Sequence, residues 1–411
     1  MEFFTRSSLA GIFKMKNLIH FRRSHQKKYP LRLFLVVLAF ISSECSTVRV
    51  EKAITLNGDD WVLYGGNPGR TNFTEAVLRP PLVQVWEYDV GAGFGNCSAA
   101  VADSLVVVGN LQGELHFINI GKGKRVGYTD LGPAIVGTPI ILGENICAAL
   151  TQTEESLVAY DFRMGAVAWK AKVGSIETSP AIFEKKIFAT TLDGALVCVD
   201  QTRGAVVWTY KIPADERKIS IRSSPATDGR TVLFGADDGK LYAVAVQDGR
   251  LRWSFQTEGS IVASPSTFDE RVFIGSQDGW YYALDADKGT LIWKHNLHSP
   301  VFASQAVTDK EIFLGTPDGN LHCLDIGTGK ELWRFRTNSV ISAAPLITGD
   351  IIYVGSLDKF LYSLDRVTGA LVWKTELPGR IRTSPVVWRD NMILLVENRS
   401  VIVFRPESKK I

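Results

Sequence analysis

Six tryptophans return at near-constant spacing along this chain, at Trp169, Trp208, Trp253, Trp293, Trp333 and Trp373. The last four of them are 40 residues apart, and short apolar runs separated by turn residues lie between them. A period near 40 residues is typical of a β-propeller, because each repeat forms one four-stranded blade that buries its faces only against neighbouring blades. We therefore expect an all-β chain arranged as a ring of blades.

The unit that ends at Trp293 shows the pattern of one blade most clearly. Its runs Arg271–Ser276, Trp280–Asp285 and Leu291–Trp293 are rich in β-branched and aromatic residues, as strands are. An Asp-Gly step separates the first two runs, and Asp-Gly favours tight hairpins because both central residues of a type I′ turn need positive φ. The same step recurs at Asp193-Gly194, Asp238-Gly239, Asp278-Gly279 and Asp318-Gly319.

Eight short steps mark the starts of eight innermost strands, so we expect eight blades. They are Ser98-Ala99, Thr138-Pro139, Ser179-Pro180, Ser224-Pro225, Ser264-Pro265, Ser304-Gln305, Ala344-Pro345 and Ser384-Pro385. The eighth blade lacks its own Trp strand, and Val83–Tyr88, which contains Trp86, matches that strand ahead of the first blade. We expect it to pair with the last blade and to close the ring, which removes open sheet edges. In the first blade, Gly127-Tyr128 stands where Trp is expected.

The pattern Ala-x-Asp-x-x-x-Gly-x-x-x-Trp at Ala283, Asp285, Gly289 and Trp293 resembles the tryptophan-docking repeat of the pyrroloquinoline-quinone (PQQ) propellers, or quinoprotein-like family. The resemblance extends over roughly residues 57 to 405, and the stretch from Trp61 to Arg70 is similar to the family's lead-in. It implies an eight-bladed propeller in which each repeated Trp packs between blades. The docking residues are then Trp86, Trp169, Trp208, Trp253, Trp293, Trp333 and Trp373.

The first 45 residues differ from the rest and are expected to be a secretory leader. Eight Lys and Arg against Glu2 and Glu44 give residues 1–44 a net charge of +6, whereas the whole chain carries +3. Residues 45–411 are therefore mildly acidic, which gives no electrostatic reason to expect nucleic-acid binding. The apolar run Leu31–Ile41 suits the hydrophobic region of a signal peptide and is too short to span a bilayer. Translation starts at Met1 or at Met15.

The segment Ser42-Ser43-Glu44-Cys45 resembles a bacterial lipobox, although Glu44 stands where a small residue is expected. We expect an exported, periplasmic protein held at the outer membrane by a lipid on Cys45, with an uncleaved signal anchor as the alternative. The expected organisation is a leader at 1–45, a lead-in at 46–80 and a propeller at 81–411.

No catalytic, cofactor-binding or metal-binding residue is expected. The cysteines Cys198 and Cys323 occupy the small-residue position of their blades, and His116 and His322 align with the strand tyrosines. His295 and His298 lack a third ligand nearby in the sequence. A PQQ-dependent oxidoreductase remains an alternative, but the vicinal cysteine pair that such enzymes carry is not found here.

A five-residue insertion between Trp208 and Trp253 falls in Ile212–Lys218, and the tract that follows it is the candidate partner site. Ile219, Ile221 and Arg222 resemble the apolar-x-apolar-Arg tract of the BamB family of outer-membrane assembly lipoproteins, and the resemblance implies that these residues contact a barrel-assembly protein. The similar tract Arg380-Ile381-Arg382 in the eighth blade favours the alternative that Arg is merely part of the repeat. The acidic pair of that family is absent from the next blade.

We therefore expect a monomeric, non-catalytic scaffold for protein partners in outer-membrane β-barrel assembly. The first alternative is a propeller that binds a polysaccharide or another ligand at its channel mouth, beside an aromatic residue such as Phe302. The second is the quinone-dependent oxidoreductase.

Overall fold

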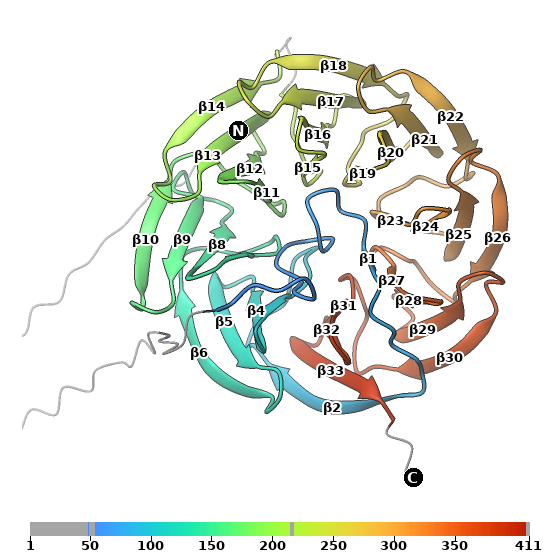
Figure 1. Cartoon of the computed structure of the whole chain (residues 1–411), viewed down its shortest axis with the longest axis horizontal. Coiled ribbons are helices and arrows are strands. Elements are labelled where there is room, and N and C mark those ends of the chain that lie inside the picture. Colours follow the sequence, from blue (N-terminus) through green and yellow to red (C-terminus); the bar gives the residue numbers. More distant parts are fainter. Residues whose placement is uncertain (1–47, 49–53, 214–217, 408–411) are drawn as a thin grey trace, which may run out of the picture. The chain divides into compact units, whose positions relative to one another are not determined.

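The computed structural model describes residues 48, 54–213 and 218–407, which belong to one compact unit, Glu44–Ile411. These residues form no helix; they form eight four-stranded antiparallel sheets that stand as blades around a common axis (Figure 1). The predicted all-β class and the eight-bladed propeller are confirmed.

Each of the first seven blades follows the chain from its innermost to its outermost strand. The first four blades are β3 (Ala100–Ala102), β4 (Leu105–Gly109), β5 (Glu114–Asn119) and β6 (Lys124–Asp130); β7 (Ile140–Leu142), β8 (Asn145–Ala149), β9 (Leu157–Asp161) and β10 (Ala166–Ala171); β11 (Ala181–Phe183), β12 (Lys186–Thr190), β13 (Ala195–Asp200) and β14 (Val206–Lys211); and β15 (Ala226–Thr227), β16 (Thr231–Gly235), β17 (Lys240–Ala245) and β18 (Leu251–Gln256).

The remaining four blades complete the ring, and the short β1 (Phe73–Thr74) adds to the seventh by pairing in parallel with its innermost strand. They are β19 (Ser266–Phe268), β20 (Arg271–Gly275), β21 (Trp280–Asp285) and β22 (Leu291–Asn296); β23 (Ala306–Val307), β24 (Glu311–Gly315), β25 (Asn320–Asp325) and β26 (Glu331–Arg336); β27 (Leu346–Thr348), β28 (Ile351–Gly355), β29 (Phe360–Asp365) and β30 (Leu371–Glu376); and β31 (Val386–Trp388), β32 (Asn391–Val396), β33 (Ser400–Pro406) and β2 (Leu82–Asp89).

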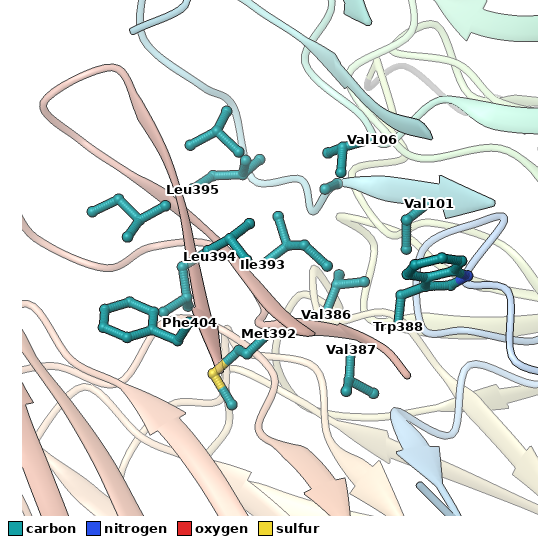
Figure 2. Packing of buried hydrophobic residues seen from close by; sticks show 14 of the residues in the cluster. Val101, Val106, Val386, Val387, Trp388, Met392, Ile393, Leu394, Leu395 and Phe404 are labelled. Carbon is teal, nitrogen blue, oxygen red and sulfur yellow. The ribbon is translucent and has the colours of Figure 1, made fainter. Parts of the chain in front are cut away.

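The outer strand of the eighth sheet comes from the N-terminal part of the chain. β2 pairs with β33 in antiparallel register from Leu82 opposite Pro406 to Asp89 opposite Ser400. The eighth and first blades share one hydrophobic cluster, in which Val101 and Val106 lie beside Ile393 and other residues of β31 to β33 (Figure 2). The first and last repeats are therefore packed face to face like any other neighbouring pair.

The repeated tryptophans lie between successive blades. The ring of Trp253 covers Gly289 so closely that a Cβ there would lie 2.4 Å from it, and Gly289 has a φ of 68° that suits glycine. The indole nitrogen of Trp253 donates a hydrogen bond of 3.0 Å to the carbonyl oxygen of Ala286. The same bond to the next blade is made by Trp86, Trp169, Trp208, Trp293 and Trp333. Trp373, in the outer strand of the seventh blade, is partly buried and packs against a cluster that includes residues of the seventh, eighth and first blades.

The segment Asp60–Thr74, called the lead-in below, crosses the centre of the ring (Figure 1). Innermost strands present an open edge to the channel, and their backbone amides need partners there. Carbonyl oxygens of the lead-in accept hydrogen bonds of 2.8–3.0 Å from the amides of Ile141, Thr227, Thr267, Val307 and Ile347 in five blades. In the other three blades, Val101 exchanges backbone bonds with Trp61, Ser179 O accepts a bond from Arg70, and Trp388 donates one to Asp60. The lead-in therefore bonds to all eight blades.

Candidate functional site

The predicted contact tract lies in the loop that leads from the outer strand of the third blade to the inner strand of the fourth. Ile219 is partly exposed and borders a groove of about 380 Å³ that is also lined by Tyr210, Asp237 and Tyr242. Tyr242 donates a hydrogen bond of 2.5 Å to Asp238, and burial together with this bond raises the pKa of the tyrosine. The tip of the predicted insertion, residues 214–217, lies outside the described residues.

Ile221 points into the protein instead of the solvent. Its side chain has no exposed surface and packs in the cluster that contains Phe188, Phe234 and Tyr242. A partner that docks on the folded propeller does not reach this side chain. Among the three predicted contact residues, only Ile219 and Arg222 have side chains exposed to solvent. The buried side chain of Ile221 anchors the loop that carries them.

Arg222 is exposed and lines a pocket of about 450 Å³ on the axis of the ring, called the channel-mouth pocket below. Its walls come from the loops that lead into the innermost strands. The lining residues include Glu177 from the loop before the third blade and Phe302 from the loop before the sixth. Tyr64 is the one lining residue that the lead-in contributes.

A ladder of hydroxyl groups runs around the same end of the channel. In six of the eight blades, the backbone amide of the step residue donates to the side-chain oxygen of the step residue in the next blade, as in Ser224 N to Ser264 Oγ and Ser264 N to Ser304 Oγ, both at 3.2 Å. The other members are Ser98 to Thr138, Thr138 to Ser179, Ser179 to Ser224 and Ala344 to Ser384. The polar step residues that mark the repeats thus fix neighbouring blades to one another.

The environments of Arg222 and its counterpart in the eighth blade differ. Arg382 forms an ion pair with Glu397, which Arg380 also approaches at 3.9 Å. In the part of the chain that the structure describes, Arg222 has no ion pair and donates no hydrogen bond. Sequence reasoning could not separate the two arginines, because both occupy the same register.

Arg70 is the residue near the site that sequence reasoning missed. It is buried and donates to the carbonyl oxygens of Pro225 (2.6 Å), Ser179 (2.7 Å) and Tyr64 (3.0 Å), and its guanidinium lies 5.1 Å from the centre of the Tyr64 ring. No carboxylate pairs with it among the described residues. Burial lowers its pKa to about 10. The only sequence signal was its place in the lead-in motif.

The remaining predicted features involve single residues. Cys97, Cys147, Cys198 and Cys323 are buried free thiols. No group of three or more His, Cys, Asp or Glu with metal-binding geometry is found in the described ranges. Within those ranges there is also no helix with the length and apolar character that a membrane crossing requires. The leader and Cys45 lie outside the described residues.

Comparison with known proteins places the chain among two kinds of propeller. The family model described as outer membrane protein assembly factor BamB matches residues 146–261, 255–344 and 317–409. BamB of Moranella endobia is 26% identical over 188 residues, which are 41% of this chain and 48% of that protein. BamB of Yersinia pestis is 24% identical over 192 residues, 41% of this chain and 47% of that protein. The chain thus spans about half the length of these curated relatives.

A 1-butanol dehydrogenase (cytochrome c) of Thauera butanivorans is 29% identical over 222 residues, 52% of this chain and 27% of that protein. Among solved structures, BamB from Moraxella catarrhalis matches with a TM-score of 0.68 and 20% identity, over 79% of this chain and 99% of that one. The quinohemoprotein alcohol dehydrogenase from Comamonas testosteroni matches with a TM-score of 0.75 and 13% identity, over 85% of this chain and 81% of that one. At these identities the solved structures support the fold alone.

Proposed function

The chain belongs to the family of the outer membrane protein assembly factor BamB, and on this premise we propose that it is a non-catalytic scaffold for protein partners in the assembly of outer-membrane β-barrel proteins. The observation that carries the proposal is the exposed guanidinium of Arg222, which has no ion pair among the described residues and follows the fully buried Ile221. Ile219, three residues earlier in the same loop, is partly exposed and borders the groove of about 380 Å³.

The rigidity of the loop is what makes it suitable for docking. The hydroxyl of Ser220 donates to Leu192 O, Ile221 is fully buried, and the amide of Ser224 is bonded to Ser264 in the next blade, so the backbone is held on both sides of Arg222. A contact residue that is already ordered loses little conformational entropy when a partner binds. The partner therefore meets a backbone that is already ordered around Arg222.

The proposed location follows from the same family. We propose that the protein is exported, that it is held in the periplasm at the outer membrane through a lipid on Cys45 or through a signal anchor, and that it acts as a monomer. Labelling with a radioactive fatty acid tests the lipid. Incorporation that persists in Cys45→Ala would contradict acylation at this residue.

The experiment that tests the function is capture of the barrel-assembly protein of the same cell by the purified propeller. Arg222→Glu should weaken capture at least tenfold, because it places a negative charge where the partner meets a positive one. Arg382→Glu is the matched control, since it alters the same register in the eighth blade. Unchanged capture by the Arg222 variant, with the fold intact, would overturn the site assignment.

The dehydrogenase relatives suggest another kind of site, a quinone held beside a metal ion. Among the described lining residues of the channel-mouth pocket, Glu177 is the one carboxylate, and Asn96 and Gln277 add side-chain amide oxygens. We derive no reaction step through such a group. The second candidate function is ligand binding, which the pocket and the exposed ring of Phe302 favour.

A further inference from the structure

The channel-mouth pocket has the size and shape of a small-molecule site. Its volume of about 450 Å³ lies within the range of roughly 300–1,000 Å³ that is common for ligand pockets. Its lining comes from several blades and is held in place by the hydroxyl ladder. Binding there requires no rearrangement of the ring.

The serine hydroxyls of this pocket are hydrogen-bond donors that have no acceptor in the described protein. Ser224, Ser264 and Ser304 each accept a bond from the amide of the preceding blade. None of the three donates a bond to another described residue, although each hydroxyl carries a proton. All three line the pocket. A ligand with oxygen acceptors would use these donors.

The charges around the pocket also favour an acceptor with negative charge. Arg222 lines the pocket without an ion pair among the described residues. Arg70 is buried 5.1 Å from the centre of the Tyr64 ring, and the described acceptors of its hydrogen bonds are all carbonyl oxygens. In a partly buried site, charges are screened less than in water, so both cations attract an anion. The exposed carboxylate of Glu177 also lines the pocket, and its negative charge weakens the attraction for an anion.

Phe302 adds an apolar surface to the wall of the pocket. Its side chain is 47% exposed, although it stands in a register where the fifth blade has Val262. We propose that the channel-mouth pocket binds a small organic anion, whose carboxylate or phosphate group accepts hydrogen bonds from Arg222 and the serine hydroxyls while its apolar part packs on Phe302. The anion site and the proposed protein-docking tract are two different sites that share Arg222.

The charge preference is tested with probes of similar size. Phenylacetate, phenyl phosphate, neutral phenylacetamide and cationic benzylamine are titrated into the purified full chain, and binding is followed by calorimetry and by fluorine NMR of ring-fluorinated analogues. We expect an anionic probe to bind at least tenfold more tightly than the amide and the amine. Which anion binds better distinguishes carboxylate from phosphate recognition. Equal affinities across the series, or preference for the amine, would overturn the proposal.

Variants test the individual residues with the better anionic probe. Arg222→Gln should weaken binding at least tenfold, whereas Arg382→Gln, which removes an arginine that is already paired with Glu397, should leave it unchanged. Glu177→Gln should strengthen binding severalfold because it removes the opposing charge. Weaker binding by the Glu177 variant would show that the carboxylate is a ligand group and would contradict an anionic occupant.

Phe302→Ala separates this proposal from the scaffold function. Truncation should weaken binding of the aromatic anion at least fivefold and leave capture of the barrel-assembly protein unchanged, because Phe302 lies outside the contact tract. Loss of capture together with unchanged anion binding would reject the pocket and would keep Phe302 as a docking residue. Since Phe302 and Arg222 are exposed, both variants should fold.

Discussion

The guanidinium of Arg70 donates a hydrogen bond of 2.6 Å from Nε to the carbonyl oxygen of Pro225, which lies 155 residues further along the chain. The same side chain bonds to Ser179 O in the third blade and to Tyr64 O within the lead-in. One buried cation thus connects the entry loops of two blades to the segment that crosses the channel. Its contacts lead to a first prediction about stability.

Arg70→Met should lower the free energy of unfolding by about 3 kcal/mol, because it leaves several buried carbonyl oxygens without donors. Urea unfolding followed by tryptophan fluorescence measures the change. Arg79→Met is the control: Arg79 forms an exposed ion pair with Asp350, and its loss should cost less than about 1 kcal/mol. Equal effects of the two substitutions would contradict a central role for Arg70.

Trp293→Ala should lower the free energy of unfolding by about 3 to 5 kcal/mol, the usual range for a large buried aromatic residue. Trp293 is 9% exposed, covers Gly329 and donates to Ile326 O at 3.1 Å. Leu291→Ala in the same strand is the control, since Leu291 is 45% exposed. A melting temperature of Trp293→Ala equal to that of the control would show that the repeated tryptophans do not hold the blades together.

Removal of residues 1–89, which include β2, should be more damaging than removal of residues 1–81, which include the lead-in but not β2. A chain that starts at Leu82 keeps the pairing of β2 with β33, whereas a chain that starts at Val90 leaves β33 as an unpaired edge. We expect the shorter chain to lose about 5 kcal/mol or more relative to the longer one, because a whole strand of backbone hydrogen bonds and its packing disappear. Calorimetry of both proteins measures the difference. Identical transitions would mean that ring closure does not depend on β2.

His322→Tyr should flatten the dependence of stability on acid pH. His322 is fully buried beside Glu331, with Arg334 and Asp318 nearby, and burial lowers its pKa below the unfolded value near 6.5. As pH falls below 6.5, the unfolded chain takes up a proton that the folded chain resists, so the wild type loses stability. Tyrosine fills the equivalent position in three other blades, where it bonds to an Asp. Parallel curves for the two proteins between pH 7 and pH 5 would contradict this prediction.

Much of the fold was predictable because each blade repeats its own local signals. The Asp278-Gly279 step does lie in the turn between β20 and β21, where the amide of Gly279 donates to Ser276 O at 3.2 Å and Gly279 has a φ of 86°. The predicted type I′ geometry was wrong, because it needs a positive φ at both residues and Asp278 does not have one. The strand bounds follow the apolar runs because each central strand is buried on both faces. The His116 and His322 positions, read from alignment with the strand tyrosines, lie in β5 and β25.

The candidate site was less predictable, because neighbouring residues in the sequence have opposite environments. Ile219 borders a groove, Ile221 is fully buried, and Arg222 faces the channel mouth. The pattern of residue types identified the tract but not which side chains reach its surface. That outcome depends on how the third and fourth blades pack around the loop.

The sequence by itself determined the repeat, the number of blades and the positions of the docking tryptophans, since these depend on residues that interact within about one 40-residue unit or with the next unit. Only the tertiary structure decided that the lead-in bonds to all eight blades, that Arg70 is buried among their carbonyl oxygens, and that Glu177, Arg222 and Phe302 surround one pocket. These groups are separated by up to hundreds of residues and share no local pattern. They meet because the ring brings the start of every inner strand to a single axis.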